Sequence, residues 1–224
     1  MLKKLKNLKS EYNKKGYIKI KNFFTKKDYE IILRETIKIQ KLKPKIGKEM
    51  IYYENDQLNR TENFLKYNKI LRGLFKNKID QFLEKLLSKK VIIFKDKINW
   101  KLPGSIGFEP HQDSQVWKRL YKDIDRFFSV LVSVDKSNIK NGCLEVVPFK
   151  HNEGLFGDHK SAIPKKICKK FKWIKIPTNP RDILIFDSFT PHKSKKNTSK
   201  KMRRIMYLTY NFKKYGNLKE EYFS

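Results

Sequence analysis

Two histidines and one aspartate carry the residue types of a metal site. His111 and Asp113 lie two positions apart, within the stretch WKLPGSIGFEPHQDSQVW at 100–117. In an extended strand, residues at this spacing project from the same face, which predicts an imidazole beside a carboxylate. We expect His192, in the stretch ILIFDSFTPHKS at 183–194, to be the third ligand. Two histidines and one carboxylate leave open positions on an octahedral metal, which is typical of non-haem Fe(II) oxygenases and unlike a closed structural zinc site.

The His-x-Asp spacing alone is weak support for a metal site, because the spacing recurs by chance in unrelated proteins. The chain has only four histidines, so few candidates for a third ligand exist. The other two, His151 and His159, fall in a stretch that we expect to be a loop with both imidazoles exposed.

The sequence resembles the phytanoyl-CoA dioxygenase family of Fe(II)/2-oxoglutarate oxygenases. Three blocks carry the resemblance, in the family's order and over roughly the C-terminal three-fifths of the chain: KINWKLPGSIGFEPHQD at 97–113, NGCLEVVP at 141–148 and DILIFDSFTPHKSKKNTSKKMRRIMYLTYN at 182–211. The next segment, FKHNEGLF at 149–156, departs from the family's usual Gly-Ser-His, with Phe149 and Lys150 in place of the small pair. This departure concerns the shape of the loop and leaves the three metal residues in place.

The resemblance implies that the two histidines and Asp113 are the catalytic Fe(II) ligands. It also implies the reaction: 2-oxoglutarate and O2 are consumed, succinate and CO2 are released, and a C–H bond of the substrate is hydroxylated. Related halogenases have a small residue in place of the carboxylate, so Asp113 favours hydroxylation. The ligands must be deprotonated to bind metal, and we therefore expect the affinity for iron to fall in acid.

The resemblance also places a cosubstrate site around Arg203, eleven residues after His192. A guanidinium forms two parallel hydrogen bonds with a carboxylate, which lysine cannot match. Ser194 looks like the family's hydroxyl donor to the same carboxylate, and Gln112 occupies the family's polar position between two ligands. Adjacent strand residues face opposite ways, so we expect Arg203 to point inward and Arg204 to point toward solvent.

Four further residues are candidates for contacts in the pocket. Lys101 alternates with Asn99 on one face of a predicted strand; it either contacts the cosubstrate or an anionic substrate group, or is one more surface lysine. Trp117 is expected to wall the pocket, and Arg126 faces it if the phase of its strand is right. Tyr53 is a candidate for substrate contact from a segment predicted as loop or irregular strand.

The charge of the chain is extreme, with 53 Lys and Arg against 23 Asp and Glu and a formal net charge of +30. Such a balance normally suggests nucleic acid or an anionic surface. Here the excess is nearly all lysine spread along the whole length, and the chain has only eight arginines. Three interpretations remain open: a compositional bias on a solvated surface, which we favour, a polyanion-binding face, or attraction of small anionic substrates.

Cysteine usage and hydropathy favour a cytoplasmic protein. The two thiols, Cys143 and Cys168, have no C-x-x-C spacing and predict no disulfide framework. No apolar run approaches the length of a membrane span, and the N-terminus lacks the apolar region of a signal peptide. Leucines at spacing three in residues 2–8 predict a basic amphipathic helix, which we expect to pack on the domain rather than on a membrane.

The order of elements predicts the fold class. A strand at 16–24 precedes a helix capped by Thr25, with Asp28 three residues later approximating a capping box. A second helix is predicted at 69–87 from its wide apolar face. Short β-branched or aromatic runs follow at 91–94, 97–102, 127–135, 143–147, 172–176, 182–187 and 204–211.

Helices followed by many strands predict a mainly β protein, a sandwich or jelly roll with a helical buttress. With 224 residues, we expect one domain at 1–224, with a mostly helical part at 1–90 and a β core at 91–212. The resemblance implies the specific version, a cupin-like double-stranded β-helix with iron at one open end.

Three functions follow, of which we favour the first. It is the hydroxylation of a small metabolite, polar or anionic; a phosphonate with an amino group would suit the lysines. The second is the same iron chemistry on nucleic acid or protein, which predicts a continuous basic groove with aromatic residues and steep salt dependence. The third is a non-catalytic basic binding module on the same fold. The sequence leaves the oligomeric state open.

Overall fold

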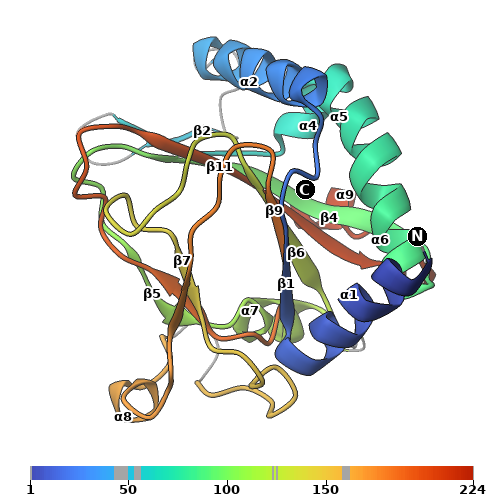
Figure 1. The fold of residues 1–224 in the computed structure, drawn as a ribbon, viewed down its shortest axis with the longest axis vertical. Coiled ribbons are helices and arrows are strands. Elements are labelled where there is room, and N and C mark those ends of the chain that lie inside the picture. The colour runs from blue at the N-terminus through green and yellow to red at the C-terminus, as the bar shows by residue number, and fades with distance from the viewer. Residues whose placement is uncertain are drawn as a thin grey trace.

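Two antiparallel sheets face each other, with helices packed on the outer face of the larger sheet (Figure 1). The computed structural model describes residues 2–42, 50–52, 57–122, 124, 126–157 and 162–223, without the side chains of 50–52 and 118–120. The larger sheet has the order β1-β9-β6-β11-β4-β3-β2 and the smaller sheet the order β5-β10-β7-β8.

The larger sheet contains β1 (Tyr17–Ile20), β2 (Met50–Tyr52), β3 (Leu58–Glu62), β4 (Val91–Lys101), β6 (Phe128–Ser133), β9 (Ile183–Asp187) and β11 (Arg203–Phe212). The smaller sheet contains β5 (Phe108–His111), β7 (Leu144–Val146), β8 (Ile174–Ile176) and β10 (His192–Ser194). Apolar side chains of both sheets meet between them, for example Leu131, Val146 and Ile205. The predicted class, a mainly β jelly roll with a helical buttress, is confirmed.

The helical layer buries the other face of the larger sheet. It contains α1 (Leu2–Lys15), α2 (Lys26–Lys41), α4 (Phe64–Tyr67), α5 (Lys69–Phe75), the π-helical turn η2 (Lys76–Asp80) and α6 (Gln81–Leu87). Their apolar residues share one core with the outward residues of the strands, such as Ile98, Trp100 and Met206. Elsewhere lie α7 (Ser114–Leu120), α8 (Lys165–Cys168), the 3-10 turn η3 (Lys213–Tyr215) and α9 (Lys219–Phe223).

The predicted helix starts agree with the structure. Thr25 caps α2: its hydroxyl accepts a hydrogen bond from the backbone N–H of Asp28, whose carboxylate accepts one from the backbone N–H of Thr25. The N-terminal amphipathic helix packs on the protein as expected, with Leu5 and Leu8 against the core and Leu2 exposed. Within the part of the chain that the structure describes, no helix is long and apolar enough to cross a bilayer.

Three elements differ from the sequence-based expectation. The helix predicted at 69–87 is divided by the turn η2, whose last residue Asp80 accepts a hydrogen bond of 2.8 Å from the Tyr210 hydroxyl. The strands predicted at 91–94 and 97–102 are one strand, β4, with an irregularity in its pairing with β11 at Thr209 and Tyr210. Helix α7 was not predicted and begins directly after Asp113.

The pairing of β4 with β11 decides which side chains enter the space between the sheets. Lys95 pairs with Thr209, Lys97 with Tyr207 and Lys101 with Arg203. Paired residues of neighbouring strands project to the same side. Since Thr209 and Tyr207 line the cavity described below, the alternating lysines of β4 lie on its side of the sheet.

Candidate functional site

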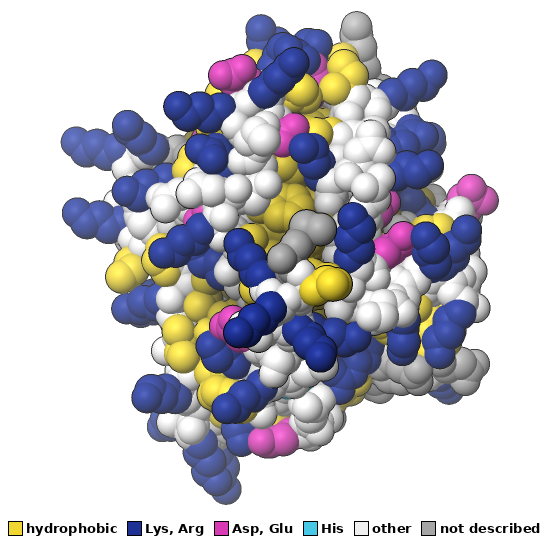
Figure 2. Space-filling view, turned by 45° about the vertical axis from the view of Figure 1, so that its right-hand side comes forward, with side chains coloured by type: hydrophobic (Ala, Val, Ile, Leu, Met, Phe, Trp, Pro, Cys, Tyr) yellow, Lys and Arg dark blue, Asp and Glu magenta, His cyan; other side chains and the backbone are white. Residues whose placement is uncertain are grey.

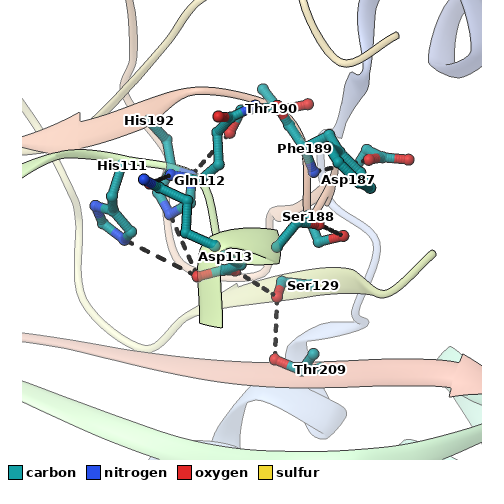
Figure 3. Close-up of polar contacts among 12 residues, drawn as sticks. His111, Gln112, Asp113, Ser129, Asp187, Ser188, Phe189, Thr190, His192 and Thr209 are labelled. Carbon is teal, nitrogen blue, oxygen red and sulfur yellow. Dashed lines mark hydrogen bonds and ion pairs between the residues drawn. The ribbon is translucent and has the colours of Figure 1, made fainter. Parts of the chain in front are cut away.

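One histidine from each of two paired strands and one aspartate converge between the sheets (Figure 3). His111 ends β5 and pairs with His192, the first residue of β10. The Nε2 atoms of His111 and His192 lie 3.9 and 3.7 Å from Oδ1 of Asp113. One ligand atom from each residue lies within 4.8 Å of the others, which is the spacing of a metal site.

Both imidazoles are oriented by backbone carbonyls. Nδ1 of His111 lies 2.7 Å from the Glu109 carbonyl oxygen, and Nδ1 of His192 lies 2.9 Å from that of Thr190. A carbonyl oxygen only accepts hydrogen bonds, so each Nδ1 must carry the proton. Each Nε2 therefore directs a lone pair toward Asp113, which is the arrangement that histidine ligands of metals show.

The electrostatics of the cluster also suit metal binding. Burial and the proximity of His111 lower the pKa of His192 to about 4, so its imidazole is neutral at physiological pH. Burial alone would raise the pKa of Asp113, but His192, His111 and Lys97 outweigh burial and lower it. The carboxylate is therefore ionised while the imidazole is neutral, as metal coordination requires.

The route by which Asp113 reaches the histidines differs from the prediction. Asp113 is not in a strand: its φ of −57° and ψ of −33° are helical, and it sits at the N-cap position of α7. The carboxylate makes no capping hydrogen bond with the helix. The turn after β5, rather than strand alternation, brings Asp113 beneath the two imidazoles.

The Asp113 carboxylate is held by a hydrogen-bond chain of two hydroxyl groups, of which the first contacts it directly. The Ser129 hydroxyl donates to Oδ2 of Asp113 at 3.3 Å, and Ser129 and Thr209 hydroxyl oxygens lie 3.0 Å apart (Figure 3). Ser129 and Thr209 are paired residues of β6 and β11, so the sheet fixes the position of this hydrogen-bond chain. Neither hydroxyl was predicted, because no local motif marks it.

A cavity adjoins the cluster, and its polar lining is basic. Besides the three clustered residues, the polar residues that line it are Lys95, Lys97, Asn99, Ser129, Lys193, Ser194, Tyr207 and Thr209. Lys95 forms an ion pair of 3.1 Å with Glu62, and Lys97 lies over the ring of Tyr207 at 5.3 Å. Burial lowers the pKa of both lysines, that of Lys97 to about 8, while Glu62 opposes the effect for Lys95 and Asp113 for Lys97. The period-two lysines of KDKINWK at 95–101 are the sequence signal that could have identified this lining.

A second group of polar residues lies beside the cavity, where the cosubstrate site was expected. Ser194 lines the cavity, and Lys101 donates a hydrogen bond of 3.0 Å to its hydroxyl. Arg203, which is 1% exposed, donates from Nη1 to the Gly142 carbonyl at 2.6 Å, while its Nε is buried without a hydrogen-bond partner. Burial and the nearby Arg203 lower the pKa of Lys101 to about 7. Arg204 points the other way and pairs with Asp135 at 2.8 Å.

Trp117 and Gln112, two other residues with predicted contacts, differ in whether they line the cavity. Trp117 lines the cavity, and its Nε1 is buried without a hydrogen-bond partner. Gln112 is not among the residues that line the cavity: its amide nitrogen donates to the carbonyls of Gly154 and Phe189, at 2.8 and 2.7 Å, and its oxygen accepts from the Phe156 N–H. These hydrogen bonds of Gln112 connect the loop at 154–156 to the turn before β10. Its contact with the cosubstrate stays a prediction.

Among the described residues, Arg126 is not one of those that line the cavity. The Arg126 guanidinium pairs with Asp187 at 2.9 Å and with the Asn152 side chain, and its contact with substrate stays a prediction. Tyr53 lies outside the described residues, as does His159. His151, expected to be exposed, is 3% exposed and contacts the Asn13 carbonyl through Nε2 at 3.1 Å.

Comparisons with known proteins show which family the sequence resembles. A family model described as Phytanoyl-CoA dioxygenase (PhyH) matches residues 12–205. The chain is 32% identical over 223 residues to the 2-aminoethylphosphonate dioxygenase of an uncultured bacterium, covering 96% of this chain and 84% of that protein. It is 32% identical over 219 residues to the methylphosphonate hydroxylase of Gimesia maris, covering 95% and 83%.

Solved structures share the fold. The structure of EctD from S. alaskensis with 2-oxoglutarate and 5-hydroxyectoine matches with a TM-score of 0.83 at 17% identity, covering 92% of this chain and 75% of that chain. Because the sequence identity is low, this likeness concerns the arrangement of the sheets and helices.

Proposed function

This chain belongs to the phytanoyl-CoA dioxygenase family, and from this premise we propose that it is an Fe(II)- and 2-oxoglutarate-dependent dioxygenase that hydroxylates a small phosphonate. The observation that carries the proposal is the combination of the His111–Asp113–His192 cluster with two cavity lysines beside it. A metal site of two imidazoles and one carboxylate supports oxygen chemistry, and the lysines support an anionic substrate.

The three clustered residues would bind iron through Nε2 of each histidine and Oδ1 of Asp113. The donor set fits the metal, because the His192 imidazole is neutral, the Nδ1 atom of each histidine faces a backbone carbonyl so that Nε2 is left for a metal, and the carboxylate is ionised. When bound, iron supplies the activation of O2 that couples conversion of 2-oxoglutarate into succinate and CO2 to hydroxylation of a C–H bond.

Arg203, Ser194 and Lys101 would bind the far carboxylate of 2-oxoglutarate. The fit rests on the buried Nε of Arg203, which has no hydrogen-bond partner, and on the ammonium of Lys101 beside the Ser194 hydroxyl. A carboxylate at this point would accept hydrogen bonds from all three side chains and offset two adjacent buried cations. These residues would hold the cosubstrate by this carboxylate.

Lys95 and Lys97 would bind the anionic group of the substrate. Both reach the cavity from one face of β4, and Lys97 forms no ion pair with any residue that the structure describes. Trp117, whose buried indole N–H has no hydrogen-bond partner, also lines this cavity. Three donors around one small cavity suit a phosphonate, and two relatives act on phosphonates according to their names.

The test is substrate-dependent succinate formation by the purified, iron-loaded enzyme. We expect 2-aminoethylphosphonate or methylphosphonate to stimulate conversion of 2-oxoglutarate and to yield a hydroxylated product visible by phosphorus NMR. Replacement of Lys97 by Met should raise the KM for the phosphonate by at least about tenfold, since a charged hydrogen bond is lost. Stimulation by neutral compounds of similar size, with none by any phosphonate, would contradict the proposed substrate class.

A further inference from the structure

We propose that Tyr222 is a positioning residue, which holds the Lys95 ammonium at the cavity so that helix α9 sets the affinity for the anionic end of the substrate. This inference rests on the proposed function, in which Lys95 binds that end. Tyr222 lies outside residues 12–205, which are the part of the chain that the family model matches.

The Lys95 ammonium has two kinds of partner. It forms an ion pair of 3.1 Å with Oε2 of Glu62, and it forms a hydrogen bond with the Tyr222 hydroxyl. It also lies 4.4 Å from the centre of the Tyr222 ring and 5.6 Å from that of Trp117. A lysine side chain has high rotamer entropy, so it stays at one place only when its end is held by such contacts.

The two partners of the Lys95 ammonium differ in how much of its positive charge they leave to attract an anionic ligand. Glu62 is a carboxylate that also contacts Arg60 Nε at 2.9 Å, so it divides its charge between two cations. Tyr222 is uncharged, because burial and the proximity of Glu62 raise its pKa to about 12. A neutral hydroxyl fixes the ammonium without cancelling its charge, so Lys95 can still attract an anion.

Tyr222 is itself held firmly. Its ring packs edge-on against Phe94 at 5.1 Å and against Trp117 at 5.8 Å. Lys219, one turn earlier in α9, forms an ion pair with the fully buried Asp96 of β4. Helix α9 therefore attaches to β4 at Asp96 and beside Lys95, and Figure 1 shows it next to this strand.

Trp117, but not Tyr222, lines the cavity among the described residues. Tyr222 thus lies behind the wall and would act on the substrate through Lys95. A purely structural role in the aromatic cluster is the competing explanation. The hydroxyl distinguishes the two, because a Phe side chain keeps the ring packing and loses only the contact with the ammonium.

The experiment compares Tyr222→Phe with Tyr121→Phe in the enzyme loaded with Fe(II) and 2-oxoglutarate without oxygen. Tyr121 packs on the same Phe94 ring at 5.4 Å, which makes it the matched control. The probe is methylphosphonate, titrated by calorimetry. We expect Tyr222→Phe to raise the Kd for methylphosphonate about two- to tenfold, as for the loss of one hydrogen bond, and to leave the Kd for 2-oxoglutarate unchanged. Tyr121→Phe should change neither.

A double-mutant cycle with Lys95→Met separates this inference from the proposed function. If Tyr222 acts through Lys95, Tyr222→Phe has no further effect on methylphosphonate affinity once Lys95 is replaced. A large effect of Lys95→Met with none of Tyr222→Phe would overturn the positioning role and leave the proposed function standing. Equal effects of both tyrosine variants, or an undiminished effect without Lys95, would show a structural role. No binding of methylphosphonate by the unaltered enzyme would overturn both.

Discussion

The charge state of each side chain at the metal cluster depends on its immediate neighbours. The neutral form of His192 is favoured by burial, and the ionised form of Asp113 by the two histidines and Lys97. The carboxylate also accepts a hydrogen bond from Ser129, which is positioned by Thr209. Hydrogen bonds of this kind orient a metal ligand, so the hydroxyl of Ser129 should matter although it would not touch the metal.

We predict that Ser129→Ala weakens iron binding about 10- to 100-fold, because Asp113 loses the hydrogen bond that fixes its carboxylate. The measurement is an anaerobic Fe(II) titration followed by the visible charge-transfer band with 2-oxoglutarate. Ser133→Ala is the control: Ser133 is equally buried on β6, but its hydroxyl contacts Thr178 at 2.5 Å instead of the cluster. Equal iron affinities in the two variants would refute the role of Ser129.

The lowered pKa of Lys97 predicts a pH dependence of substrate binding. Its pKa is about 8, so the ammonium predominates below this pH and the neutral amine above it. The cationic form binds an anionic substrate, and kcat/KM for the phosphonate should therefore fall as pH rises past about 8. The measurement is a pH profile of kcat/KM with methylphosphonate.

Lys97→Arg is the control for this profile. A guanidinium remains protonated throughout the accessible range, so the variant should lose the decline above about pH 8 even if its overall activity is lower. A decline that persists unchanged in Lys97→Arg would assign the titration to another group.

At the level of elements, the sequence predicted the sheets better than the turns between them. Alternation on β4 correctly placed Asn99 and Lys101 on one face. Alternation on β11 turns Arg203 and Arg204 to opposite sides, but Arg204 lies against Asp135 and not in solvent as expected. Strand alternation failed at Asp113. This residue has the type and position of a helix N-cap but directs its carboxylate at the histidines. A local capping rule is overridden there by the contacts of the cluster, as is common at functional sites.

Other contacts at the site could not be predicted from the sequence, for a physical reason. Glu62, Lys95 and Tyr222 are separated by up to 160 positions and meet only because β3 pairs with β4 and α9 returns to β4. Spacing rules describe neighbours along one element and carry no information on such pairings. The burial of His151 was missed in the same way, since its partner is the carbonyl of Asn13 in α1.

The junction between α1 and the turn before β10 gives the next prediction. Gly16 has a φ of +78°, and its carbonyl accepts hydrogen bonds of 2.9 Å from the Asp187 N–H and the Thr190 hydroxyl. An added Cβ would lie 2.6 Å from both His151 Nδ1 and Thr190 Oγ1. We expect Gly16→Ala to reduce the free energy of unfolding by about 1–3 kcal/mol, from backbone strain and steric overlap.

The measurement is denaturant unfolding, and Gly73→Ala is the control. Gly73 lies within α5 with no atom within 4 Å of an added Cβ, so the substitution should stabilise the protein by about 0.5–1 kcal/mol. A Gly16→Ala variant as stable as the unaltered protein would contradict the described packing of this junction.

For the whole molecule, the question is whether the net charge of +30 serves the reaction. Figure 2 shows Lys and Arg side chains spread over the visible face, interrupted by apolar and uncharged ones, rather than gathered in one band. Exposed charges farther from the cavity than the Debye length, about 8–10 Å at physiological salt, are largely screened. The lysines that matter for a small anion are then those whose side chains reach the cavity.

This reasoning predicts a weak dependence of catalysis on salt. Between about 50 and 200 mM NaCl, kcat/KM for methylphosphonate should change by no more than about threefold, because one or two buried contacts dominate the interaction. Replacing the exposed Lys165 and Lys166 of α8 by Gln should likewise leave kcat/KM unchanged. A nucleic-acid substrate would behave otherwise, since the release of counterions from six to ten phosphate contacts lowers affinity by about 10³–10⁵ over the same range. Turnover with that steep salt dependence, stimulated by single-stranded DNA or RNA, would replace the small phosphonate with a polyanion as the substrate.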